Sequence, residues 1–308
     1  MTGAEGAAGA ESVPDDWPPL ILAVAPNGAR KTRADHPALP IEPGELAETA
    51  ASCLAAGACL LHLHVRDNAG GHSLDAGRYR EATAAIRERV GAAMIVQITT
   101  EQVGRFGRAE QMACVRAVQP EAVSLALREL VPDAGAEAEA AGFLAELAEA
   151  GVLAQFILYD PADLERFLAL RRGGVIPAGE RSLLYVLGRY SAGQRSQPSD
   201  LLPFLAVRPP AAGEVWSLCA FGPRETACAL AAATLGGHVR VGFENNLQLA
   251  DGTLAPDNAA AVAAVAGAAR GIGRPLADAE AARRLMAAEG TGRPAVASPG
   301  GAGPAIAD

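Results

Sequence analysis

Short apolar runs alternate with longer amphipathic stretches along most of this chain. The apolar runs predict buried strands, and the amphipathic stretches predict helices. The predicted strands cover residues 20–25, 60–67, 94–98, 122–125, 152–158, 182–187, 215–219 and 238–242. The predicted helices that follow them cover residues 44–56, 76–90, 108–118, 136–150, 161–172, 199–207, 224–235 and 256–271. The pattern is therefore a strand followed by a helix, eight times over.

This repetition predicts an α/β fold. Strands that are apolar throughout indicate a parallel sheet covered on both faces. Eight such units in about 250 residues are typical of a single-domain (β/α)₈ TIM barrel. A doubly wound open sheet is the alternative, but no glycine-rich GxGxxG turn follows the first strand. We expect a flexible leader over 1–17, a catalytic barrel over 18–289 with one extra helix at 278–289, and a disordered tail over 290–308.

Composition narrows the functional classes. The formal net charge of -9 argues against a nucleic-acid surface, which needs clustered Lys and Arg. The five cysteines lack CxxC spacing and lie in apolar segments, so we expect buried thiols in a reducing cytoplasm. No apolar run reaches the length of a bilayer span, and no basic region followed by an apolar core marks a signal peptide. These features predict a cytoplasmic protein without a nucleic-acid surface or a membrane span.

Two histidines on the second predicted strand are the first candidates for chemistry. Strand alternation places His62 and His64 on one face, while Leu61, Leu63 and Val65 pack behind them. Two neutral imidazoles suit a divalent metal such as zinc, which usually takes a third protein ligand. The pair alone is a weak signal, because one histidine could be a core residue and the other incidental.

The barrel prediction supplies the third ligand. Chemistry in such barrels lies at the C-terminal ends of the strands, and strands one, two and eight are neighbours once the barrel closes. Arg240 and Glu244 lie at or just after the end of the eighth strand. Glu244 can therefore join the two histidines in the two-His-one-carboxylate set of catalytic zinc sites. It could also be a surface carboxylate, but its apolar neighbours favour an inward side chain.

Three motifs together resemble the β-keto acid cleavage enzyme family. They are Gly28-Ala29 with TRADHPALP (32–40), Gly57-Ala58 with HLHVRD (62–67), and GGHVRVGFENNL (236–247). The resemblance extends from about Leu20 to Met286. It implies a zinc-dependent (β/α)₈ barrel that is commonly a homo-oligomer. It also implies condensation of a β-keto acid with acetyl-CoA, followed by cleavage to acetoacetate and a new acyl-CoA.

The resemblance also implies roles for single residues. By motif, His62, His64 and Glu244 would hold the metal, and Arg240 would lie beside the substrate and take part in proton transfer. Thr99 and Ser124 match hydroxyl positions that contact substrate in the family. A metal that chelates the keto oxygen and carboxylate of the substrate, beside a permanently charged guanidinium, suits cleavage that passes through an enolate.

The sequence departs from the family pattern at three places. Asn245 stands where the family has an aspartate thought to assist proton transfer, and an amide cannot accept a proton. Arg30 replaces a glutamate, which should disfavour a cationic substrate tail. The glycine-rich loop after the sixth strand is altered, so its candidate CoA contacts become Arg189 and Gly193.

These departures leave other functions open. One is a metal-dependent aldolase or lyase that acts on a keto acid without CoA. Another is a metal-binding ligand sensor that has lost the chemistry. Among the other histidines, we expect structural roles for His36 and His238 and an exposed position for His72 in its Gly-Gly-His turn.

Overall fold

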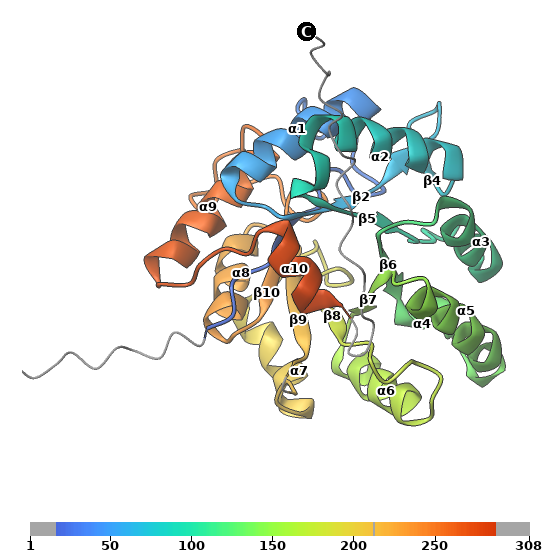
Figure 1. Ribbon diagram of the computed structural model, residues 1–308. Helices are drawn as coiled ribbons and strands as arrows, with labels where there is room; N and C mark the ends of the chain where they lie inside the picture. The colour runs from blue at the N-terminus through green and yellow to red at the C-terminus, as the bar shows by residue number, and fades with distance from the viewer. Residues whose placement is uncertain (1–16, 212, 288–308) are drawn as a thin grey trace, which may run out of the picture.

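The computed structural model describes residues 17–211 and 213–287, which form a closed barrel of parallel strands surrounded by helices (Figure 1). Around the barrel the strands follow the order β1-β10-β9-β8-β7-β6-β5-β2, and β2 pairs with β1 to close the ring. The barrel strands are β1 (Leu22–Val24), β2 (Leu60–Leu63), β5 (Ile95–Thr99), β6 (Ala122–Ala126), β7 (Leu153–Leu158), β8 (Ser182–Leu187), β9 (Val215–Ala220) and β10 (His238–Val241). The predicted TIM barrel is confirmed.

Helices connect successive strands along the outside of the barrel. They are α1 (Pro43–Ala56), α2 (Ala76–Val90), α3 (Arg108–Val118), α4 (Leu127–Leu130), α5 (Glu137–Glu149), α6 (Pro161–Arg172), α7 (Leu202–Val207), α8 (Glu225–Thr234), α9 (Asn258–Gly271) and α10 (Ala279–Met286), with short 3₁₀ turns at Gly91–Ala93, Ala134–Ala136 and Pro198–Leu201. Several helices begin at an aspartate whose carboxylate accepts a backbone N–H of the first turn. Asp75, Asp160, Asp257 and Asp278 cap α2, α6, α9 and α10 in this way.

Most of the buried apolar side chains of the described residues lie in two layers. The larger layer lies between the strands and the surrounding helices, and it includes Leu61, Leu63 and Val65, as the strand alternation predicts. A smaller layer lies at the N-terminal ends of the strands, where α10 packs against residues such as Ile21 and Ile95. Figure 1 shows α10 lying across this end of the barrel. The opposite end, formed by the carboxyl ends of the strands, is where barrels of this kind carry their active sites.

The second predicted strand is divided in the structure. β2 ends at Leu63, and the following residues form a separate antiparallel hairpin of β3 (Val65–Arg66) and β4 (His72–Ser73). Arg66 binds this hairpin to the first loop, because its guanidinium donates to the carbonyls of Gly28 at 2.6 Å and Lys31 at 2.9 Å. The predicted extra helix is α10. The predicted leader 1–17, apart from Trp17, and the predicted tail 290–308 lie outside the described residues.

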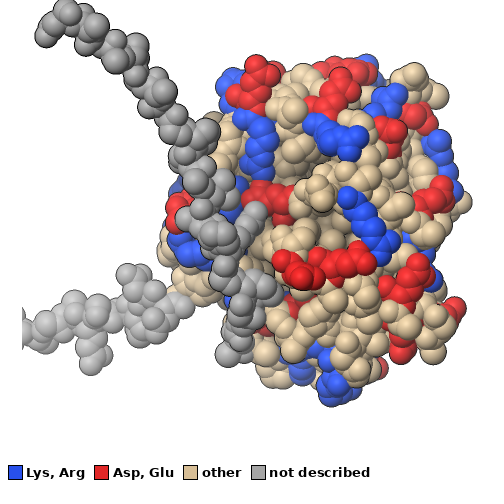
Figure 2. Space-filling model, turned by 45° about the vertical axis from the view of Figure 1, so that its right-hand side comes forward, with Lys and Arg blue, Asp and Glu red and all other residues tan. Residues whose placement is uncertain are grey.

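Surface charge is mixed in sign on the face shown in Figure 2, where Lys and Arg lie among Asp and Glu rather than in one patch. Exposed ion pairs such as Arg116 with Glu146, 2.7 Å apart, also bring the two signs together at the surface. The five cysteines are buried free thiols, as expected. Among the described residues, no helix combines the length and the apolar character needed to cross a membrane.

Candidate active site

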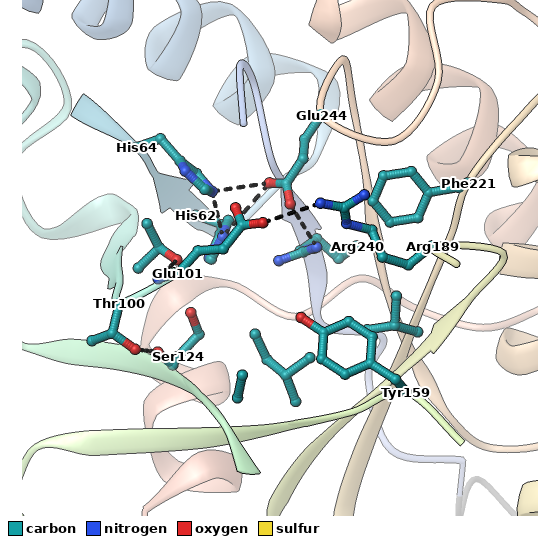
Figure 3. Close-up of a pocket in the computed structure, with 14 residues that line it drawn as sticks. His62, His64, Thr100, Glu101, Ser124, Tyr159, Arg189, Phe221, Arg240 and Glu244 are labelled. Atoms are coloured by element: carbon teal, nitrogen blue, oxygen red, sulfur yellow. Dashed lines mark hydrogen bonds and ion pairs between the residues drawn. The ribbon is translucent and has the colours of Figure 1, made fainter. Parts of the chain in front are cut away.

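His62, His64 and Glu244 meet at the carboxyl ends of β2 and β10 (Figure 3). β1 pairs with both of these strands, so residues almost two hundred positions apart become neighbours. The two Nε2 atoms of the histidines are 3.1 Å apart, and Glu244 Oε2 lies 3.6 Å from His62 Nε2 and 3.3 Å from His64 Nε2. The structure thus brings the three predicted ligands together around one point.

Two glycines allow Glu244 to reach the histidines. Gly242, at the end of β10, has a φ of +131°, and a Cβ there would lie 2.6 Å from the carbonyl oxygen of Ala25. Gly28, in the loop after β1, has a φ of +61°, and a Cβ there would lie 2.6 Å from Glu244 Cγ. Any larger residue at either position would displace the backbone or the glutamate.

A chain of buried amides orients His62. Its Nδ1 lies 2.8 Å from Gln97 Oε1, and Gln97 Nε2 donates to Gln155 Oε1 at 3.3 Å. Because the Gln97 oxygen can only accept, Nδ1 of His62 carries the hydrogen and Nε2 presents its lone pair to Glu244 and His64. Burial, with Arg240 nearby, lowers the pKa of His62 well below its ordinary value, so the ring is neutral. A neutral ring is the form that binds metals.

Arg240 comes from β10 and is buried beside the three ligands. Its Nη2 donates to Glu244 Oε1 at 3.2 Å and to Cys219 Sγ at 3.3 Å, while Nε and Nη1 are buried without a partner among the described residues. Although burial raises the pKa of Glu244, the charge of Arg240 and the polar contact with His64 hold it well below its ordinary value. The site therefore combines an ionised carboxylate with a guanidinium that keeps free donors.

These side chains open into a cavity of about 380 Å³, which includes its mouth. Its lining consists of His62, His64, Thr99, Thr100, Glu101, Ser124, Ala126, Ile157, Tyr159, Val186, Arg189, Phe221, Arg240 and Glu244. Thr99, Ser124 and Arg189 thus line the same cavity as the ligand cluster, and their binding roles stay predictions. Thr99 Oγ1 accepts from the Glu101 amide at 3.1 Å, whereas Ser124 Oγ is buried without a partner in the described chain.

Three other predicted site residues do not line this cavity. Arg30 is exposed, and the next residue, Lys31, turns inward instead and donates from Nζ to the backbone oxygen of Glu244 at 2.6 Å. Gly193 lies in an exposed turn of the loop after β8. Asn245 is buried behind the lining, and neither its Oδ1 nor its Nδ2 has a partner among the described residues.

Several cavity residues were missed by the sequence reasoning. Glu101 follows β5 and pairs with Arg189, 3.3 Å away, across the cavity, and the Arg189 guanidinium also lies over the Phe221 ring. Tyr159 follows β7 and points its hydroxyl into the cavity in Figure 3. Each of these residues, like the predicted ones, lies at or after the carboxyl end of a strand. Their place at the carboxyl ends of predicted strands was the sequence signal that could have identified them.

His72 corrects one prediction. We expected it to be exposed, but it is buried on β4, with its ring centre 5.2 Å from that of His64 and its Nε2 2.8 Å from the carbonyl oxygen of Glu101. Burial lowers its pKa to about 3, so it is neutral and its Nε2–H donates to that carbonyl. His36 and His238 are buried and bonded to backbone groups, consistent with the structural roles expected.

Glu225 supports the turn that carries Glu244. Its Oε1 accepts the backbone N–H of Gly242 at 3.0 Å, and its Oε2 lies 3.5 Å from Asn246 Nδ2. Burial raises the pKa of this carboxyl to about 8, well above its ordinary value of 4.5. The protonated form of Glu225 is therefore the form that the fold stabilises.

Replacing Glu225 with Gln should raise the stability of the protein relative to wild type more at pH 8 than at pH 5. The pKa of Glu225 is higher in the folded protein than in the unfolded chain, so protonated Glu225 stabilises the fold. This contribution is complete below about pH 4.5 and is lost as the pH rises towards 8. Gln keeps an acceptor for Gly242 and does not ionise. Urea unfolding of both proteins at the two pH values measures the difference, with Glu149→Gln on the exposed end of α5 as the control. A stability difference that does not change with pH would contradict this assignment.

Comparison with known proteins decides the family. The sequence profile of the β-keto acid cleavage enzymes matches residues 19–287, nearly all of the described chain. The chain belongs to this family. As a β-keto acid cleavage enzyme, it is an acyltransferase that breaks a carbon–carbon bond.

Two relatives are each 30% identical to the chain. One is the 3-keto-5-aminohexanoate cleavage enzyme of Fusobacterium nucleatum, with 87% of this chain and 97% of the relative covered. The other is the 3-oxoadipate:acetyl-CoA acetyltransferase of Cupriavidus necator, with 87% and 94% covered. The solved structure of ObcA with oxaloacetate has a TM-score of 0.65 at 18% identity, covering 81% of this chain and 67% of that one. The last similarity supports the barrel fold of this β-keto acid cleavage enzyme, and the first two support its chemistry.

Proposed function

We propose that this protein is a zinc-dependent enzyme that condenses a β-keto acid with acetyl-CoA and releases acetoacetate and a new acyl-CoA. In the balanced reaction, the bond between the keto carbon and C2 of the acid breaks. A bond forms between C2 and the acetyl carbon, and the CoA thiol passes to the released acyl group. One observation carries the proposal: three metal-type ligands and a guanidinium with two free donors face one cavity.

The donor set fits zinc. Two imidazole nitrogens and one carboxylate oxygen lie within 4.8 Å of one another, and Glu244 Oε2 is buried without a hydrogen-bond partner among the described residues. Three protein ligands leave a coordination position open, as catalytic zinc requires. When bound, the metal would polarise the keto oxygen of the substrate as a Lewis acid.

The protein's own groups would orient the acid and stabilise its charge. The free Nε and Nη1 of Arg240 can donate hydrogen bonds to a substrate carboxylate or to a developing enolate oxygen on the same side as the metal ligands. Ser124 Oγ offers one further unpaired group. Arg189, at the other side of the cavity, is the candidate contact for the CoA ester.

The cavity favours a substrate without a cationic tail. Its only carboxylates within the described lining are Glu244, which faces Arg240, and Glu101, which is paired with Arg189. An ammonium tail would need one of them as its partner and would have to displace an arginine. Arg30 is exposed and outside the lining, so it does not contribute to this preference.

The proposal is tested by incubating the zinc-loaded protein with acetyl-CoA and a panel of β-keto acids, with products followed by mass. Acetoacetate and a matching acyl-CoA are expected, and both should depend on acetyl-CoA. Cleavage without CoA would favour the lyase function instead. Tight binding of the acids with no turnover would favour the sensor. The predicted homo-oligomer stays a prediction, which light scattering on the same sample would test.

Gln97 should control metal affinity through His62. Replacing it with Leu removes the acceptor for Nδ1–H, and a histidine ligand that loses this hydrogen bond typically binds its metal about 10–100-fold more weakly. Gln97→Glu restores an acceptor and should keep the affinity at least at the wild-type value. Competition with a chromophoric chelator measures zinc binding directly. The matched control is Gln155→Leu, which changes the amide that bonds to Gln97 rather than to His62. It should lower zinc affinity less than Gln97→Leu does. Equal losses in the two variants would contradict the role of Gln97.

A further inference from the structure

The wall of the cavity that faces the metal ligands is apolar. Ala126, Ile157 and Val186 lie on β6, β7 and β8, and Phe221 follows β9. In the strand order β1-β10-β9-β8-β7-β6-β5-β2, β7 lies opposite β1, while β8 and β6 lie opposite β2 and β10. Val186 therefore stands across the barrel from β2, which carries His62, and Ala126 stands across from β10, which leads to Glu244. Ile157 lies between them, opposite β1, and Phe221 lies at the side of the wall, after the strand that pairs with β10.

These wall residues form one continuous buried surface. They pack together with Leu184 and Cys219 in a single cluster, and Tyr159 lies against its edge. The exposed fraction of Ile157, at 8%, is the largest among the buried members of this cluster, as expected for a side chain that faces a narrow cavity. No residue of the cluster carries a charge.

The charged groups around the cavity already have partners. Glu101 pairs with Arg189 at 3.3 Å, and Glu244 pairs with Arg240 at 3.2 Å. A carboxylate tail on the substrate would have to share Arg189 with Glu101, and an ammonium tail would have to share Glu101 with Arg189, so either tail places a like charge beside a partly buried pair. An alkyl tail leaves both pairs intact and removes apolar surface from water.

We propose, given the function proposed above, that the substrate is a β-keto acid with a short uncharged alkyl tail lying on Ala126, Ile157, Val186 and Phe221. The carboxylate and keto groups then face Arg240 and the metal ligands, and the tail points to the opposite strands. The wall residues are all at most 8% exposed, so the space beside them is narrow and admits only a short straight or branched chain. Each methylene that the wall covers should raise kcat/KM by about fourfold until the space is filled.

Three β-keto acids of equal length test this proposal, with an alkyl, an ω-carboxyl and an ω-amino tail. With zinc and acetyl-CoA, we expect kcat/KM for the alkyl acid to exceed both others by about 100-fold. A charged tail that reacts equally well or better overturns the inference and leaves the proposed function standing. If no acid reacts, the proposed function fails. Calorimetry on the same three acids then tests the tail separately, and we expect the alkyl acid to bind most tightly. If the alkyl acid binds no more tightly than an acid with a charged tail, the inference is overturned.

Variants of the wall give a second test. Ile157→Glu should lower kcat/KM for the alkyl acid by about 100-fold, because an unpaired carboxylate is costly in an apolar wall. The same change should improve the ω-amino acid relative to the alkyl one by at least about tenfold. Ala162→Glu, on the exposed surface of α6, adds the same carboxylate outside the cavity and should leave the preference unchanged.

A smaller change covers the case in which Ile157→Glu does not fold. Ile157→Val removes one methylene from the wall and should shift the preference towards an alkyl tail one carbon longer. Melting curves confirm that each variant is folded before its kinetics are compared. An unchanged order of substrates in both folded variants would overturn the assignment of this wall to the tail.

Discussion

Replacing Glu244 with Gln should remove zinc binding and turnover together. The substitution keeps the size of the side chain but removes the only carboxylate ligand, and Gln offers a weaker, neutral oxygen. We expect zinc affinity to fall by at least about 100-fold and kcat/KM by at least about 1,000-fold at limiting zinc. Chelator competition and product detection by mass measure the two effects on one preparation.

Glu101→Gln is the matched control for this experiment. Glu101 lines the same cavity but lies outside the three-ligand cluster. The control should therefore keep the wild-type zinc affinity, whatever its effect on turnover. Wild-type zinc affinity in Glu244→Gln would show that the metal is held elsewhere and would remove the basis of the proposed function.

Arg240→Lys should lower turnover while zinc binding is kept. Lysine retains the positive charge but lacks the planar fork, so the two free donors of Arg240 can no longer meet the substrate together. Loss of donors of this kind typically costs about 100–1,000-fold in kcat. We expect a loss of that size, with zinc affinity within a few-fold of wild type.

The control for Arg240→Lys is Arg116→Lys, which makes the same exchange in a surface ion pair with Glu146. Its kinetics should match those of wild type. If zinc affinity falls in parallel with turnover in Arg240→Lys, Arg240 acts by holding Glu244 in place. Activity near that of wild type would exclude the guanidinium from the reaction.

The sequence predicted the barrel because each strand and helix carries its own local pattern. It predicted that the candidate ligands lie together because closing the barrel makes strands one, two and eight neighbours, so that their carboxyl ends meet. His62, His64 and Glu244 follow from that rule together with residue chemistry. The roles of Arg240 and Asn245 in the reaction stay predictions.

Loop geometry was harder to predict. Arg30 and Lys31 are adjacent and both basic, and no periodicity in the loop indicates which of them turns inward. His72 was expected in an exposed turn because a two-residue strand leaves no pattern to detect. Ile157 and Val186 look like ordinary core residues in the sequence, since an apolar cavity wall and an apolar core use the same side chains.

The contact between Gly28 and Glu244 has a consequence for how the protein matures. The glycine follows the first barrel strand and the glutamate follows the last, so they meet only when β1 pairs with β10. A nascent chain that has not yet released residue 244 from the ribosome has two histidines and no third ligand. A cation that needs all three ligands binds only the closed ring, and its binding free energy is added to the stability of that ring alone. Metal loading would therefore be the last event of folding, and it would stabilise the closed barrel against reopening between β1 and β10.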